Sequence, residues 1–222
     1  MATKSILSQL AKVYDPLASP NTLNGKLLYR DICDTKVPWD AQLPEPQLKR
    51  WKGWSNTLTD DLTVPRALAP YHQPISEIPL HAFGDASIHG VSAAVYAVFQ
   101  QTQGIMQTRH CKSGIAKRNL TIPQLELIAE HMAVNLVTNV QKALHTDPVG
   151  IHCWLDSTVA LYWIKGQGEY RQFDRVANRV HKIQQFSKVS WHHVPTSENP
   201  DDLRSRRQNV INSQLRERAL TG

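Results

Sequence analysis

The sequence contains few cysteines and no long apolar segment. Cys33, Cys111 and Cys153 are its three cysteines, and no two of them have CxxC spacing. They are too few and too scattered for a disulfide framework or a zinc knuckle, so we expect reduced thiols. The chain lacks a run of about 18 apolar residues, which argues against a transmembrane helix, and its first residues lack the apolar core of a signal peptide. We therefore expect an intracellular protein that is not secreted and does not bind a membrane.

Acidic residues are absent between Asp85 and Glu126, whereas basic residues crowd the second half of this interval: Arg109, Lys112, Lys117 and Arg118. A net charge of +6 with such a local excess favours a polyanionic partner such as nucleic acid. We expect these residues in a loop that leads into a helix, where free main-chain N–H groups also attract phosphate. The alternative is a solvated loop that only keeps the protein soluble.

A second basic stripe is predicted on the helix in FDRVANRVHKIQQF. Basic residues recur at helical spacing from two residues before this string onward, on the face opposite the core positions: Arg171, Arg175, Arg179 and Lys182. The stripe either follows a nucleic-acid strand or is an ordinary solvated helix face.

Four acidic residues occupy positions that a fold can bring together. Asp85 and Asp156 end short apolar segments that are predicted to be strands, Glu126 lies on the apolar face of a predicted helix, and Asp202 lies at the start of a terminal helix. Taken one at a time, the three aspartates can be explained as turn, cap and first-turn residues, but Glu126 has no capping role. Clustered carboxylates repel one another unless cations lie between them, and oxygen ligands suit Mg²⁺ or Mn²⁺. A site with two such ions is suited to phosphodiester hydrolysis.

The order of elements predicts an α/β fold. Three strands, PLHAFGDAS, GVSAAVYAVFQ and GIMQTRHC, form an antiparallel meander, and Thr121 with Gln124 has the pattern of a capping box that starts a helix running to about Leu144. The segment VGIHCWLDS is a fourth strand, helices follow, and KVSWHHVP is a fifth strand before the last helix. We expect His193 in that fifth strand to be a structural residue, and we do not count it as catalytic.

From about Pro79 to Arg206 the chain resembles the ribonuclease H domain of BEL/Pao-type LTR retrotransposon polyproteins, a region also labelled a peptidase. The strings FGDAS, LTIPQLEL, DSTVALYWI, FDRVANRV and HHVPTSENPDDLRSR occur in that family's order and spacing. The preceding segment resembles the thumb or connection region of the reverse transcriptase. We therefore expect a connection-like segment over 1–75, with Trp51 and Trp54 packing it onto the next domain, a ribonuclease H-like domain over 76–208 and a tail over 209–222. A proline-rich linker is expected at about 61–79.

The resemblance implies a mixed five-stranded sheet with helices on both faces, preceded by a small, mainly helical segment. It also implies hydrolysis of the RNA strand of RNA/DNA hybrids during reverse transcription, with Asp85, Glu126, Asp156 and Asp202 holding two Mg²⁺ or Mn²⁺ ions. The polymerase domain of the same polyprotein would be a partner, in cytoplasm, virus-like particle or nucleus. Alternatives are a decayed remnant that binds nucleic acid without cutting it and an aspartic peptidase, although no Asp-Thr-Gly or Asp-Ser-Gly string occurs.

One departure from the family concerns the last acid. The family motif usually reads NPADLASRG, whereas this chain has NPDDLRSRR, so Asp201 stands in place of an alanine. We expect Asn199 to cap the closing helix and Pro200 to be its first residue. Asp202 then occupies the position of the family's fourth carboxylate.

Overall fold

The structure is a computed structural model that describes residues 1–15, 17–58, 78–101, 104–144, 149–167 and 174–206. Most of the expected linker and all of the expected tail lie outside these residues. No helix in the described part of the chain has the length and apolar character needed to cross a membrane.

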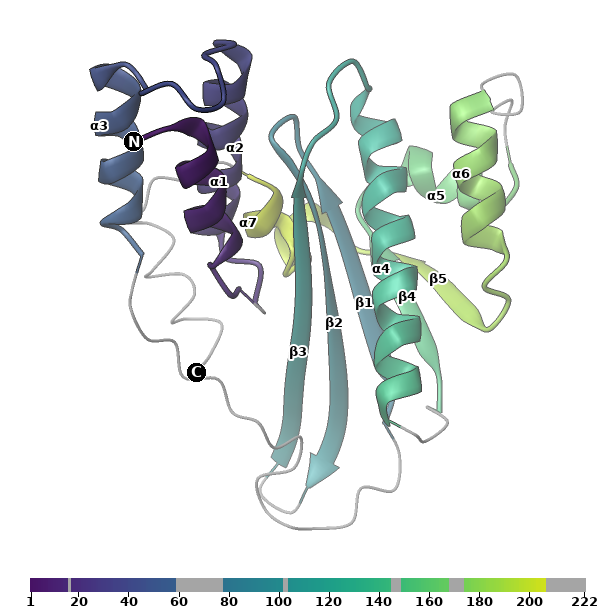
Figure 1. The fold of residues 1–222 in the computed structure, drawn as a ribbon. Coiled ribbons are helices and arrows are strands. Elements are labelled where there is room, and N and C mark those ends of the chain that lie inside the picture. The colour runs from purple at the N-terminus through teal and green to yellow at the C-terminus, as the bar shows by residue number, and fades with distance from the viewer. Residues whose placement is uncertain (16, 59–77, 102–103, 145–148, 168–173, 207–222) are drawn as a thin grey trace.

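The centre of the fold is a mixed five-stranded sheet with the order β3-β2-β1-β4-β5 (Figure 1). Its first three strands, β1 (Leu80–Ala86), β2 (Gly90–Gln101) and β3 (Gly104–Ile115), pair antiparallel. The other two, β4 (Ile151–Leu155) and β5 (Val189–His193), run parallel to β1. The predicted meander and the predicted ribonuclease H-like sheet are both confirmed. His193 is exposed at the end of β5, so it is not the packed structural residue that we expected.

One face of the sheet is covered by α4 (Ile122–Leu144), with α5 (Thr158–Ile164) and α6 (Asp174–Gln184) beside it. Their apolar side chains form one core with alternate residues of β1, β2 and β4. The expected start of α4 is confirmed, since the Thr121 amide donates to Gln124 Oε1 at 3.0 Å. Because α4 is long and its apolar stripe is continuous, the helix fixes the position of Glu126 relative to the sheet.

On the other side of the sheet lie α1 (Thr3–Ala11), α2 (Pro20–Asp34) and α3 (Glu45–Ser55), together with the short α7 (Asp202–Ser205), which follows the 3-10 turn Thr196–Glu198. Two side chains of α2 bond the main chain at the end of β3: Lys26 Nζ donates to Ser113 O at 3.1 Å, and Arg30 Nη1 donates to Ala116 O at 3.0 Å. Helices therefore flank both faces, as expected.

The tryptophans of α3 pack within the N-terminal helices, which corrects the expectation that they join this segment to the sheet. Trp51 and Trp54 are buried in one cluster with Ile6, Leu28 and Ile32. Their indole nitrogens donate to Gln9 Oε1 and to Asn21 O, both at 2.8 Å. The helical segment thus has an apolar core of its own.

Candidate active site

The ends of two neighbouring strands bring the first two acidic residues together. β1 and β4 are adjacent and parallel, so their carboxyl ends reach the same edge of the sheet, where Asp85 and Asp156 lie. Glu126, in the second turn of α4, adds a third carboxylate. Oxygens of these three residues lie within 4.8 Å of one another.

Asp85 is 2% exposed and accepts a hydrogen bond from the Ser205 hydroxyl of α7. Burial raises the pKa of Asp85 to about 8, and the neighbouring carboxylates Asp156, Asp202 and Asp201 contribute to the rise, whereas Ser205 opposes it. Without a cation the site therefore retains protons at neutral pH.

Glu126 is also buried, at 4% exposed. Burial raises its pKa to about 9, with Asp85 and Asp156 as further causes. Its Oε2 atom has no hydrogen-bond partner among the described residues. A buried carboxylate oxygen without a donor is costly, and a divalent cation would both satisfy it and neutralise the charges around it. The residues present therefore fit Mg²⁺ or Mn²⁺, which prefer carboxylate oxygens.

Asp202 lies beside this cluster but is not part of the three-residue group. Its side chain forms an ion pair with Arg206 and is 20% exposed. It is close enough to raise the pKa values of Asp85 and Glu126, although burial and nearer carboxylates raise them more. Its role as a fourth ligand stays a prediction.

The segment before α7 differs from our expectation. Asn199 follows the 3-10 turn and Asp201 is the residue before the helix, so α7 starts at Asp202 and not at Pro200. The Asn199 amide donates to Gly84 O and its Oδ1 accepts from the Asp201 amide, both at 3.0 Å. Asn199 is buried; its Oδ1 accepts from the amide two residues on, as a capping residue does, and its Nδ2 binds the main chain of β1, so it also ties this turn to the sheet.

Glu130 is a buried acid that sequence reasoning missed. It is 0% exposed, neither carboxyl oxygen has a hydrogen-bond partner among the described residues, and burial raises its pKa well above the usual range. A Cβ at Gly84 would lie 2.4 Å from Glu130 Oε1, so glycine lets this carboxyl approach β1. The spacing i to i+4 from Glu126 places both on one helix face and could have identified it.

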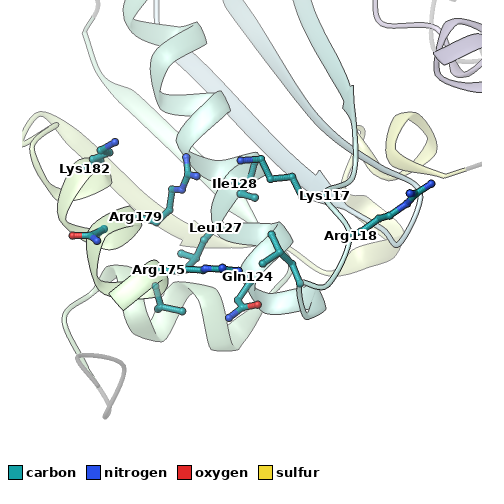
Figure 2. Close-up of a pocket in the computed structure, with 11 residues that line it drawn as sticks. Lys117, Arg118, Gln124, Leu127, Ile128, Arg175, Arg179 and Lys182 are labelled. Carbon is teal, nitrogen blue, oxygen red and sulfur yellow. The ribbon is translucent and has the colours of Figure 1, made fainter. Parts of the chain in front are cut away.

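The two predicted basic segments meet in one groove of about 490 Å³ between the start of α4 and α6. Figure 2 shows the groove, whose basic lining residues are Lys117, Arg118, Arg175, Arg179 and Lys182. A second hollow of about 450 Å³ shares Arg179 and includes Lys112. The packing of α6 against α4 therefore creates one basic surface beside the helix that carries Glu126.

The remaining basic residues differ in their surroundings. Arg118 points away from α6 (Figure 2) and forms an ion pair with Asp34 of α2. Lys112 belongs to β3 and not to a loop. The Arg109 side chain and all of Arg171 lie outside the described part of the chain.

The sequence matches the model of the Pao retrotransposon-like RNaseH-like domain over residues 2–157, which is more than half of the chain. The chain belongs to this family. The match to the Pao retrotransposon-like domain includes the N-terminal helices and the residues Asp85, Glu126 and Asp156; Asp202 lies beyond it. A search of curated proteins found no match.

Solved ribonucleases H resemble this Pao-like domain at low identity. RNase H1 of Halobacterium salinarum NRC-1 is 17% identical over 56% of this chain and 89% of its own, with a TM-score of 0.38. The N-terminal RNase H domain of a Mycobacterium tuberculosis protein is 12% identical over 65% and 99%, with a TM-score of 0.39. LC11-RNase H1, from a compost metagenome and solved with an RNA/DNA hybrid, is 15% identical over 56% and 89%, with a TM-score of 0.35.

Proposed function

We propose that this chain is a metal-dependent endonuclease that hydrolyses the RNA strand of RNA/DNA hybrids during retrotransposon reverse transcription. The observation that carries the proposal is the cluster of Asp85, Glu126 and Asp156 oxygens within 4.8 Å of one another, in a chain that belongs to a ribonuclease H-like family. Three carboxylates held this closely at a sheet edge are costly without a positive charge between them.

Asp85, Glu126 and Asp156 would hold the divalent cations, two in number, with Asp202 as the fourth ligand. Ions bound there would activate a water for attack on phosphorus and would stabilise the leaving 3′ oxygen. Ser205 donates to Asp85 and thereby orients its carboxyl group. Glu126, on α4, would also recognise a 2′-OH, the group that distinguishes RNA from DNA.

The basic groove supplies the binding surface for the substrate. Lys117, Arg175, Arg179 and Lys182 line it, and cationic side chains suit the phosphates of a nucleic-acid backbone. Because phosphate contacts position a duplex without reading its sequence, we expect cleavage with little sequence preference. The natural partner in this proposal is the polymerase domain of the same polyprotein.

The proposal is tested by adding Mg²⁺ to the protein with a labelled RNA/DNA hybrid, single-stranded RNA, duplex DNA or a peptide. We expect cleavage of the RNA strand of the hybrid alone, and loss of cleavage in Asp85→Asn and Asp156→Asn. The control is Asp174→Asn, since Asp174 is exposed at the start of α6. Binding of the hybrid without cleavage would support a decayed remnant, and cleavage of the peptide would support the peptidase alternative.

A further inference from the structure

A hollow of about 450 Å³ runs along α4. We call it the α4 hollow; it is lined by Lys112 of β3, by Arg179 of α6 and by α4 side chains between Ile128 and Asn139. α4 packs mainly over β1 and β2, which leaves the edge strand β3 less covered. Lys112 pairs with Ala93 of β2, which faces the α4 core, so the lysine points to the same side of the sheet as α4.

The α4 hollow is continuous with the basic groove at the start of α4. Ile128 and Arg179, both labelled in Figure 2, line the two in common. In the part of the chain that the structure describes, no acidic residue lines either one. Lys112 and Arg179 supply the positive charge of the α4 hollow. Cations without neighbouring acids attract a polyanion, so the surface that suits phosphates extends along α4.

The α4 hollow also offers contacts that phosphates do not use. Met132 and Leu136 contribute apolar atoms, and Asn135 and Asn139 contribute exposed amides. Asn135 Nδ2 donates to His131 O at 2.7 Å, which leaves Oδ1 as an acceptor. The backbone of a duplex offers phosphates and sugars, whereas unpaired bases offer flat faces that stack and edges that form hydrogen bonds. This combination of side chains therefore suits a single strand better than a duplex.

Arg179 keeps His131 of the α4 hollow in its neutral form. Arg179 Nη1 lies 2.8 Å from His131 Nδ1, and because a guanidinium only donates hydrogen bonds, Nδ1 is the acceptor. The pKa of His131 is lowered by burial, then by Arg179 and Lys182. The pair thus presents an uncharged imidazole beside a guanidinium, two planar groups on which a base can stack.

The length of the α4 hollow corresponds to a few nucleotides. Ile128 and Asn139 are about three helical turns, or about 16 Å, apart along α4. A stacked strand rises about 3.4 Å per nucleotide, so about four nucleotides span this distance. Single-strand sites of about four nucleotides or more are typical of proteins that bind without sequence preference.

We propose that the α4 hollow binds the first unpaired nucleotides of a single strand that continues beyond the RNA/DNA hybrid. The inference rests on the proposed function, which places the hybrid in the adjoining basic groove. Lys112 and Arg179 would contact phosphates of the single strand, and its bases would pack against His131 and Met132 and bond the amide of Asn135. Such a site favours a hybrid that ends in an unpaired extension over a blunt one.

The test is fluorescence anisotropy with the full, unmodified chain in EDTA, so that binding is measured without cleavage. A blunt hybrid is compared with hybrids of the same duplex length that carry an extension of about four nucleotides at each strand end in turn. At least one extension should raise the affinity about tenfold, through base contacts. The same extension built from abasic nucleotides, which keeps the phosphates, should keep only a small part of this gain.

Two results of this comparison would overturn the proposal. One is that no extension raises the affinity. The other is an equal gain with and without bases, which would mean that the α4 hollow takes any polyanion, an acidic protein segment included.

A pair of variants locates the gain. Asn135→Asp places a negative charge in the α4 hollow and should remove most of the gain from the extension, with a much smaller effect on the blunt hybrid. Gln167→Glu is the matched control, because it adds the same charge at an exposed residue that lines neither the groove nor the α4 hollow, and it should keep the gain. An undiminished gain in Asn135→Asp, or an equal loss in Gln167→Glu, would contradict the site.

Binding in EDTA and cleavage in Mg²⁺ separate this site from the proposed activity. A base-dependent gain in binding without Mg²⁺-dependent cleavage would support the α4 hollow as a single-strand site and overturn the endonuclease activity alone. Cleavage of the hybrid without any base-dependent gain would overturn the single-strand site and leave the endonuclease activity supported.

Discussion

Asp201 and Asp202 are adjacent in sequence but lie in different surroundings. Asp201 is 0% exposed and lies near Glu130. It helps to raise the pKa of Glu130, although burial and nearer carboxylates have larger effects. Asp202 is partly exposed and acts on both Asp85 and Glu126. Asp201 precedes α7 and Asp202 is its first residue, so the two carboxylates do not occupy equivalent positions at the site.

Asp202→Asn should lower the Mg²⁺-dependent cleavage rate by orders of magnitude, whereas Asp201→Ala should leave most of it. The reason is that only Asp202 combines proximity to Asp85 and Glu126 with access to solvent. Single-turnover rates on a labelled hybrid, measured at saturating protein, compare the two variants directly. Greater loss in Asp201→Ala would show that the ligand position is shifted by one residue.

At the residue scale, the sequence predicted the carboxylates that the fold brings together, because each follows a local pattern: Asp85 and Asp156 end strands, and Glu126 sits on an apolar stripe. It did not predict the burial of Glu130. That burial depends on Gly84, which lies 46 residues earlier in another element, and local periodicity carries no information about such a contact.

At the scale of elements, the packing of α2 on α3 depends on a close approach. A Cβ at Gly25 of α2 would lie 2.1 Å from Cζ2 of Trp54 in α3. Trp54 is 9% exposed and hydrogen-bonded to Asn21 O, so its indole has little freedom to move. A glycine within a helix normally lowers stability by roughly 0.5–1 kcal/mol relative to alanine, and here it is what allows the contact.

Gly25→Ala should therefore destabilise the protein by about 1–3 kcal/mol, the usual cost of overpacking. Gly53→Ala, in α3, is the matched control because a Cβ there meets nothing within 4 Å; it should be neutral or stabilising by up to about 1 kcal/mol. Urea unfolding of both variants measures the difference. Equal stability of the two would mean that α2 and α3 separate at little cost.

The basic groove is also a property of two elements. Lys117→Glu combined with Arg175→Glu should weaken hybrid binding and reduce the slope of log K against log salt by about 0.9 for each lost phosphate contact. Lys188→Glu, a charge reversal at an exposed lysine that is not among the groove residues, should change the slope less. Fluorescence anisotropy at several salt concentrations gives the slopes. An unchanged slope in the folded double variant would mean that the groove does not contact phosphate.

The elements themselves were largely predictable, since long apolar stripes and alternating strands specify α4, α6 and the strands through local pattern, whereas the mixed five-stranded sheet was expected from the family resemblance. Which elements pack against one another was less predictable. The basic residues of the loop before α4 and of α6 were predicted as two separate patches, because the spacing along one helix does not determine which helix packs beside it. The extension of β3 through Lys112 is set by its pairing with β2, which continues beyond the apolar part of the strand.

At the scale of the whole molecule, the N-terminal helices and the sheet are joined by polar contacts near the site. Lys26 and Arg30 bond the main chain around the end of β3, and Asp34 holds Arg118 in the loop that leads into α4. These contacts connect α2 to the segment just before Glu126. The boundary expected near residue 75 stays a prediction. Helices from both sides of that boundary pack around the segments that carry the carboxylates.

The buried carboxylates make the stability of the whole molecule depend on pH. The pKa of Asp85 is raised from 3.8 to about 8 and that of Glu126 from 4.5 to about 9, mainly by burial. The folded state therefore binds more protons than the unfolded state across this window, so the free energy of unfolding falls as pH rises from about 4 to about 9 and changes little from these two groups beyond it.

In metal-free buffer, the melting temperature should consequently fall between pH 7 and pH 9, a range above the titration of histidine. Mg²⁺ should raise the melting temperature more at pH 9 than at pH 7, because the ion binds the deprotonated carboxylates and competes with protons. The double variant Asp85→Asn, Glu126→Gln should show a smaller pH dependence and no Mg²⁺ effect, since neither side chain titrates. Calorimetric scans at both pH values, with EDTA or with Mg²⁺, provide the comparison. If the unmodified protein instead gains stability from pH 7 to pH 9 in EDTA, these carboxylates are ionised in the metal-free fold, and the argument that their repulsion calls for a cation fails.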